Sequence, residues 1–192
     1  MTDQQKNTVT NGIRAITFIT AVGVLLFDQY TKWLVETNLA LGEAVYPIAS
    51  IDHIFRFVHV YNRGAAFGML QGGGWLFSLI AIGVSLFITY YVFALKERDI
   101  LLRLALGLMM GGALGNVLDR IRLGHVTDFI HFNLRPLVAD YPLLDFQILN
   151  WPVFNVADTA VVTGVVILMV LSFFEQPATE EQEKPVVSQE TD

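Results

Sequence analysis

A short segment near the middle of the chain, GALGNVLDRIRLGHVTDFIH at residues 112–131, places many polar side chains at the end of an apolar run. These side chains are Asn116, Asp119, Arg120, His125, Asp128 and His131. Ionisable groups beside hydrocarbon are costly, so their concentration here predicts a functional site. A second polar group, Asn155 and Asp158, opens the last apolar run of the chain.

Asp128 and Asp158 are two carboxylates that could act together as an acid and a base. Two carboxylates in a poorly hydrated site do not both ionise easily, so the pair becomes one acid and one base. Attack of water on a peptide carbonyl needs such a pair: one group withdraws a proton from water and the other donates toward the carbonyl oxygen. We expect Asp158 to hold the ionised form because it lies near a helix N-terminus.

Each carboxylate also has a simpler interpretation. Asp128 could be an exposed loop carboxylate. Asn155 could be a helix N-cap, with Asp158 in the third helical position completing a capping arrangement.

Residues of the same segment are candidates for supporting this pair. Asn116, Asp119 and Arg120 have i, i+3 and i+4 spacing, which places them on one face of a helix. Alternatively, Asp119 and Arg120 mark the helix end and reach water, or the three form a structural polar network. Glycines just before them would let a neighbouring helix approach closely, as small residues do in membrane bundles: Gly111, Gly112 and Gly115.

Two further motifs supply polar groups. Asp28 and Lys32 in FDQYTKW have the i, i+4 spacing of an ion pair. This pair would either support the site or only neutralise its own two charges at the membrane interface. In YNRGAAFG, Asn62 and Arg63 could hold extended substrate backbone while Gly64 permits close approach; a plain turn is the alternative.

Other chemistries find less support. The chain has no cysteine, which excludes disulfides, thiolate metal sites and a cysteine nucleophile. A serine nucleophile has no motif. His125, Asp128 and His131 offer metal-binding side chains, but they would face together only on a continuous helix, and Gly124 with the β-rich HVTDFIH argues against one. We therefore expect no metal, no other cofactor and, without a basic patch, no nucleic-acid partner.

The composition indicates that these residues sit in a membrane protein. The chain has 192 residues, of which 54% are hydrophobic, and a mean hydropathy of +0.52. About 20 apolar residues are needed to cross a bilayer. Four stretches qualify, at about 13–35, 75–95, 100–118 and 156–174. Residues 1–12 are then a cytoplasmic N-terminal tail, and 175–192, with six acidic residues and one lysine, a disordered acidic C-terminal tail.

Four spans bring both termini to one side and gather the polar motifs on the other. The short loop with Lys96, Arg98 and Arg103 is the densest basic connection, so we place the termini in the cytoplasm and the polar cluster outward. On that outer face, IFRFVHVYN at 54–62 is typical of a strand or hairpin, and PLLDFQILNW at 142–151 of a short interfacial helix. The predicted fold is all-α integral membrane: a four-transmembrane-helix bundle, residues 13–174, with a small outward-facing β-rich cap.

Taken together, FDQYTKW, YNRGAAFG, GGALGNVLDRIRLGHVTDF and FNVAD resemble, in order, the motifs of the lipoprotein signal peptidases, also called signal peptidase II. The resemblance covers about residues 28–158. It implies an intramembrane aspartic endopeptidase of the bacterial inner membrane that removes the signal peptide from diacylglyceryl-modified prolipoproteins, cutting before the lipidated cysteine at the periplasmic face.

By motif, the resemblance implies a catalytic dyad of Asp128 and Asp158. It assigns positioning or supporting roles to Asn116, Asp119, Arg120, Asn155, Asp28, Lys32, Asn62 and Gly64. It also implies contact with membrane lipids, sensitivity to globomycin and no metal. One departure is the segment between the two aspartates, which is longer than usual for the family.

Two other classes of protein remain open. A small transporter or channel could line a polar path with Asp28, Asp119 and Asp158, but such a path should continue toward the inner face, where spans two to four are nearly uncharged. A non-catalytic lipoprotein-binding scaffold would use the same pocket and would tolerate conservative replacement of the dyad.

Overall fold

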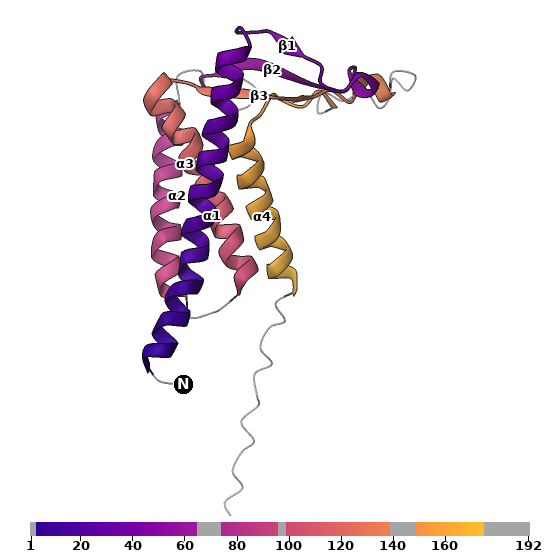
Figure 1. The fold of residues 1–192 in the computed structure, drawn as a ribbon. Helices are drawn as coiled ribbons and strands as arrows, with labels where there is room; N and C mark the ends of the chain where they lie inside the picture. Colours follow the sequence, from indigo (N-terminus) through magenta and orange to yellow (C-terminus); the bar gives the residue numbers. More distant parts are fainter. Residues whose placement is uncertain (1–2, 65–73, 96–98, 139–148, 175–192) are drawn as a thin grey trace, which may run out of the picture.

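The computed structural model describes residues 3–64, 74–95, 99–138 and 149–174, with side chains from residue 12 onward. Four long helices form a bundle, and a small sheet covers one end of it (Figure 1). The helices are α1 (Asp3–Asn38), α2 (Gly74–Ala94), α3 (Ile100–Leu123) and α4 (Val156–Phe174). The C-terminal tail predicted at 175–192 lies outside the described residues.

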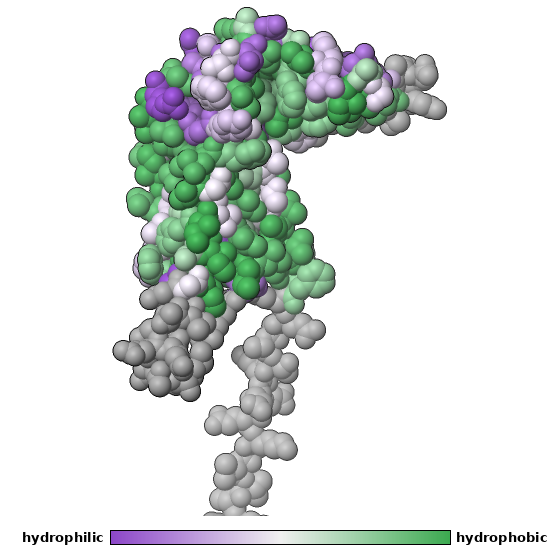
Figure 2. Space-filling model, in the orientation of Figure 1, coloured by the Kyte–Doolittle hydropathy of each residue, from purple (hydrophilic) through white to green (hydrophobic). Residues whose placement is uncertain are grey.

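All four helices are long and apolar enough to cross a membrane, which confirms the four predicted spans. Their sides carry exposed apolar side chains such as Ile19, Phe87 and Phe173, with exposed fractions of 70%, 63% and 82%. Hydrophobic residues cover the bundle in Figure 2, whereas hydrophilic residues gather at the sheet end. A helix satisfies its own backbone hydrogen bonds, so this apolar surface suits hydrocarbon.

The third helix is longer than its sequence predicted. We expected α3 to end near residue 118, but it continues to Leu123, where Gly124 adopts a positive φ of 76° and its N–H donates to the Arg120 carbonyl. Glycine favours this left-handed conformation, which explains the end point. Asp119 is buried, so the interpretation that it reaches water is wrong, whereas Arg120 does lie in the last turn of the helix. The first helix is also longer, beginning at Asp3 within the segment treated as a tail.

The predicted glycine contacts around α3 are confirmed. A side chain at Gly111 would meet the Ala21 carbonyl oxygen of α1 at 2.5 Å, and one at Gly112 would collide with the Ala157 carbonyl oxygen of α4. At Gly115, a Cβ would lie 2.6 Å from Asp28 Oδ2. These glycines bring the backbones of α1 and α4 against α3, which packs on all three other helices.

The sheet has three antiparallel strands in the order β1–β2–β3: β1 (Ala44–Val45), β2 (Phe55–Asn62) and β3 (Val126–Phe132). Two short 3-10 turns accompany it, η1 (Ala49–Ile51) and η3 (Arg135–Val138). β2 confirms the predicted strand, and its pairing with β3 shifts register between Phe57 and Val60. Most of the interfacial helix expected at 142–151 lies outside the described residues.

The sheet connects directly to two of the helices. β3 begins three residues after α3 ends, and a bridge between Ile130 and Phe154 ties β3 to the residues just before α4. The end of α3, the strand β3 and the start of α4 are therefore held together, although the 23 residues 133–155 separate β3 from α4 in the chain. This junction is where the polar residues meet.

Replacing Gly112 by alanine is expected to destabilise the bundle. The new methyl group would press on the backbone of α4 at Ala157, and such overpacking costs about 1–3 kcal/mol. Thermal unfolding of the purified protein in detergent measures the effect. Gly83→Ala is the matched control, since a side chain at this helical glycine of α2 meets nothing within 4 Å. Equal melting temperatures for the two variants would contradict the close packing of α3 on α4.

Candidate active site

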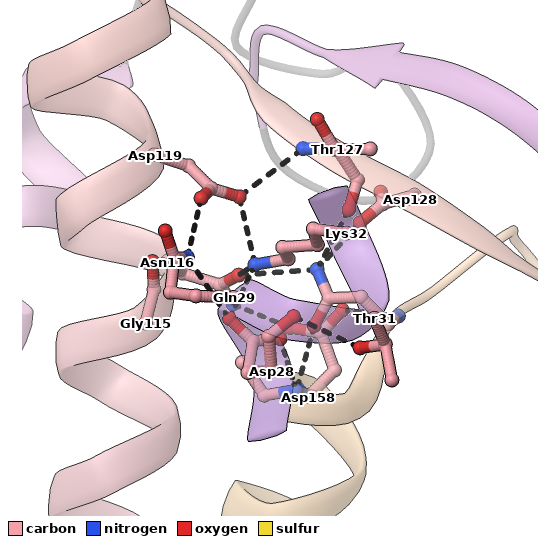
Figure 3. Close-up of polar contacts among 12 residues, drawn as sticks. Asp28, Gln29, Thr31, Lys32, Gly115, Asn116, Asp119, Thr127, Asp128 and Asp158 are labelled. Carbon is pink, nitrogen blue, oxygen red and sulfur yellow. Dashed lines mark hydrogen bonds and ion pairs between the residues drawn. The ribbon is translucent and has the colours of Figure 1, made fainter. Parts of the chain in front are cut away.

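A buried lysine lies between two carboxylates at the sheet end of the bundle. Lys32 Nζ is 2.9 Å from Asp28 Oδ2 and 2.7 Å from Asp119 Oδ2, and these side chains are at most 2% exposed. Figure 3 shows the lysine between the two aspartates, one on its own helix and one on α3. The predicted Asp28–Lys32 pair is confirmed, and its second partner makes it a link between helices.

The carboxylates of this network have additional donors. Asp28 Oδ1 accepts from the Ala157 backbone N–H in the first turn of α4 at 2.9 Å, and Asp119 Oδ1 accepts from the Gln29 side chain at 2.7 Å. Buried charges are tolerated only when they are paired and hydrogen-bonded in this way. The network thus ties α1, α3 and α4 together beside the site.

Asn155 and Asp158 form a reciprocal cap at the start of α4. The Asp158 N–H donates to Asn155 Oδ1 at 2.9 Å, and the Asn155 N–H donates to Asp158 Oδ2 at 3.2 Å. This is the geometry of a capping box, so the simpler interpretation of these residues is confirmed. It leaves Asp158 Oδ1 for another partner, the Asn116 side-chain amide, which donates to it at 2.7 Å.

Asp128 lies on β3 and is 2% exposed, so the interpretation as an exposed loop carboxylate is wrong. Its Oδ2 accepts from the Asn62 amide at 2.9 Å and its Oδ1 from the Asn155 amide at 2.7 Å. Burial, together with the charge of Asp158, raises the pKa of Asp128 to about 7, although the two amides and Lys32 oppose the shift. Asp128 is therefore a carboxyl that exchanges a proton near neutral pH.

Two asparagines connect Asp128 to Asp158. The Asn155 amide donates to both Asp128 Oδ1 and Asn116 Oδ1, the latter at 3.1 Å, and the Asn116 amide donates in turn to Asp158. Lys32 also donates to Asn116 Oδ1 at 3.0 Å, which fixes the orientation of that amide. The two aspartates, 30 positions apart in sequence, thus share one hydrogen-bonded network.

The remaining predicted residues surround this network. The Gly64 N–H donates to Asn62 Oδ1 at 3.1 Å, which aims the Asn62 amide at Asp128. Arg120 interacts electrostatically with Asp119, Asp128 and Asp158, but its guanidinium lies over the Phe77 ring of α2, 5.9 Å from the centroid. Among the hydrogen bonds of the described residues, Arg120 donates only to the Asn116 carbonyl within its own helix.

The two histidines of HVTDFIH have partners other than Asp128. His131 lies three residues from Asp128 on β3 and therefore on the opposite face of the strand, whereas His125 precedes the strand. His125 stacks on Tyr61, with ring centroids 3.7 Å apart, and His131 Nδ1 accepts from Arg56 Nε at 2.9 Å. Burial lowers the pKa of His131, and the Arg56 charge adds to the effect. No group of three or more metal-binding side chains occurs in the described part of the chain.

Sequence reasoning missed three residues of the site. Gln29 bonds both Asp119 and Arg122, and Thr127 bonds Glu36 at 2.6 Å. Gln29 and Thr127 sit next to predicted residues, but no spacing rule relates Gln29 to Asp119 or Thr127 to Glu36, because each pair joins elements some 90 positions apart.

Four helices long and apolar enough to span a membrane hold two hydrogen-bond-linked aspartates at one end, with Asp128 buried and Asp158 partly exposed. A membrane-embedded peptidase of the aspartic type needs such a pair of carboxyl groups. The family model of signal peptidase (SPase) II matches residues 20–174. The chain belongs to this signal peptidase II family, whose function is to remove the signal peptide from prolipoproteins.

Individual relatives agree with this assignment. A lipoprotein signal peptidase of Geobacillus kaustophilus is 44% identical over 154 residues, covering 80% of this chain and 90% of the relative. That of Bacillus velezensis is 36% identical over 165 residues, covering 86% and 98%. A bacterial membrane enzyme solved by the in meso method at 2.3 Å resolution is 30% identical, with a TM-score of 0.70, over 87% of this chain and 93% of that one.

Replacing Lys32 by methionine is expected to destabilise the protein strongly. It leaves Asp28 and Asp119 buried without their cation, and removing one partner of a buried ion pair costs about 3–5 kcal/mol. Thermal unfolding in detergent measures the loss, and adding Asp119→Asn to the same variant should recover part of it. A double variant no more stable than Lys32→Met would contradict charge imbalance as the cause. Arg122→Met, which removes an exposed bond to Gln29, is the control.

Proposed function

We propose that Asp128 and Asp158 are the catalytic dyad that activates water for cleavage of the signal peptide. The observation that carries the proposal is the chain of asparagine amides that joins these two aspartates: Asn155 donates to Asp128 and to Asn116, and Asn116 donates to Asp158. The buried network of Asp28, Lys32 and Asp119 holds its charges in ion pairs, so it supports the dyad instead of competing with it.

The environments of the two aspartates suggest their roles. Asp128, with a pKa of about 7, is protonated at neutral pH in a large fraction of molecules, so it is the acid that donates toward the scissile carbonyl oxygen. Asp158 accepts from its own cap and from Asn116 at the N-terminus of α4, where the helix dipole favours an anion. Asp158 is then the base that takes the proton from water.

The substrate we propose is a prolipoprotein already carrying diacylglycerol, cleaved just before the lipidated cysteine. The apolar sides of the helices are suited to the acyl chains, and the sheet-end polar cluster is suited to the peptide. Asn62, Gly64 and Arg120 lie at the edge of the dyad and are proposed to position the peptide backbone. Globomycin-type cyclic peptides would compete for the same position.

We also propose the orientation in the membrane. The starts of α1 and α3 and the ends of α2 and α4 lie at the end of the bundle opposite the sheet (Figure 1). The sequence around the α2–α3 connection is rich in basic residues, Lys96, Arg98 and Arg103, and the positive-inside rule therefore supports a cytoplasmic location for that end and a periplasmic one for the dyad. Residues 13–174 would form the peptidase domain, with residues 1–12 and 175–192 as cytoplasmic extensions.

Asp128→Asn and Asp158→Asn are each expected to abolish cleavage while substrate binding is retained, because asparagine keeps the shape but neither donates nor accepts the proton. The measurement is cleavage of a diacylglyceryl-modified prolipoprotein by purified protein in detergent, with rates lowered at least about 10³-fold. Binding is measured in parallel. Unimpaired cleavage by either variant would overturn the dyad, and binding without cleavage by the unmodified protein would indicate a scaffold.

The dyad also predicts a pH dependence. As pH rises through about 7, Asp128 loses the proton that it must donate, so kcat/KM should fall on the alkaline side. The Asn62 amide stabilises the ionised form of Asp128; Asn62→Ala should therefore raise its pKa and move the alkaline limb up by about one pH unit. Asn150→Ala, which removes a bond to His131 instead, is the control. A downward shift in Asn62→Ala would contradict the assigned acid.

A further inference from the structure

Thr127 precedes Asp128 on β3 and is completely buried. Neighbouring residues of a strand point to opposite faces. Asp128 faces Asn62 and Asn155, whereas the Thr127 hydroxyl faces α1 and donates to Glu36 Oε1 at 2.6 Å. The residue beside the proposed acid is therefore held from the far side of the sheet.

The N–H, the carbonyl oxygen and the hydroxyl of Thr127 each form a hydrogen bond to a different helix or helix cap. Its N–H donates to Asp119 Oδ2 of α3 at 3.3 Å, and its carbonyl oxygen accepts from the Asn155 side chain, the cap of α4, at 3.4 Å. The hydroxyl adds the third connection, to α1. Thr127 is thus the point of β3 at which three helices are joined to the strand.

The bond to Glu36 is the one among these that depends on the side chain of residue 127. A hydroxyl donating to a carboxylate forms a short, charge-assisted hydrogen bond, stronger than one between neutral groups. Glu36 lies one helical turn beyond Lys32, so the same face of α1 supplies the cation of the buried network and the acceptor for Thr127. This face connects the ion network to the strand that carries Asp128.

Holding the Thr127 side chain sets the rotation of the strand about its own axis. Because Asp128 projects from the opposite face, that rotation determines where its carboxyl lies relative to Asn62, Asn155 and Asp158. Catalytic groups must be held to a fraction of an ångström, and small displacements reduce the rate of the chemical step. Backbone bonds alone would leave the strand in place but its rotation less constrained.

We infer that Thr127 and Glu36 are positioning residues that aim Asp128 through a hydroxyl–carboxylate bond between β3 and α1. The inference rests on the proposed role of Asp128 and adds a determinant that no motif of the chain indicated. It assigns the pair no contact with the substrate. Loss of the hydroxyl–carboxylate bond should therefore lower kcat and leave KM nearly unchanged.

The test compares substitutions that remove the bond with substitutions that retain it, in steady-state cleavage of a diacylglyceryl-modified prolipoprotein. Thr127→Val and Glu36→Ala remove it and should each lower kcat about tenfold or more, with KM within about twofold. Thr127→Ser keeps the hydroxyl and Glu36→Gln keeps an acceptor oxygen, so both should stay within about threefold of the unmodified protein. The double variant Thr127→Val/Glu36→Ala should be no slower than either single variant.

Controls separate this inference from the proposed dyad and from general destabilisation. Thr37→Val removes a nearby hydroxyl that bonds only backbone carbonyls of α1 and the adjacent Asn38 side chain, and it should leave kcat unchanged. Active Asp128→Asn would overturn the dyad itself. Inactive Asp128→Asn with fully active Thr127→Val would overturn only the positioning role. Equal losses in Thr127→Val and Thr127→Ser, or a kcat loss matched by the fraction unfolded at the assay temperature, would also overturn it.

Discussion

The rest of the site depends on the neutralisation of buried charge around Lys32. An ammonium group at this depth is stable because Asp28 and Asp119 approach it from two helices, and the carboxylates are stable because the lysine and backbone or amide donors satisfy them. None of the three groups would be tolerated there alone. Close approach at Gly115, whose missing side chain leaves room for the Asp28 carboxylate, makes the arrangement sterically feasible.

The same groups serve stability and chemistry. Asn155 caps α4 and also donates to Asp128. The side-chain oxygen of Asn116 accepts a hydrogen bond from Lys32, and its side-chain nitrogen donates one to Asp158. The capping and catalytic interpretations of Asn155 and Asp158 are therefore compatible. A carboxylate held in a capping box is fixed in position at a helix N-terminus, which is also where an ionised base is favoured.

The small sheet positions the Asp128 carboxyl. β3 carries Asp128, follows closely on the end of α3 and is bridged to the residues just before α4. Its pairing with β2 brings Asn62 to the same face as Asp128. Glu36 holds the opposite face of β3 through Thr127. Three helices and one strand thus restrain a single carboxyl, whose pKa of about 7 reflects its burial and the nearby charge of Asp158. Such restraint is what general acid catalysis requires.

The sequence by itself determined the four spans, and it predicted a strand or hairpin within 54–62. It also offered the Asp28–Lys32 pair, the capping box and the two aspartates as candidates. These features follow from local rules: apolar length, alternation, i, i+4 spacing and cap chemistry act between neighbours in the chain. The end of α3 was missed because Asp119 and Arg120 suggested a helix end that reaches water, whereas Asp119 is buried and paired with Lys32. Only the tertiary structure decided the second partner of Lys32, the amide bridge between the aspartates and the bond from Glu36 to Thr127. Each joins residues far apart in the chain, and such contacts depend on how helices rotate and pack, which no local pattern specifies.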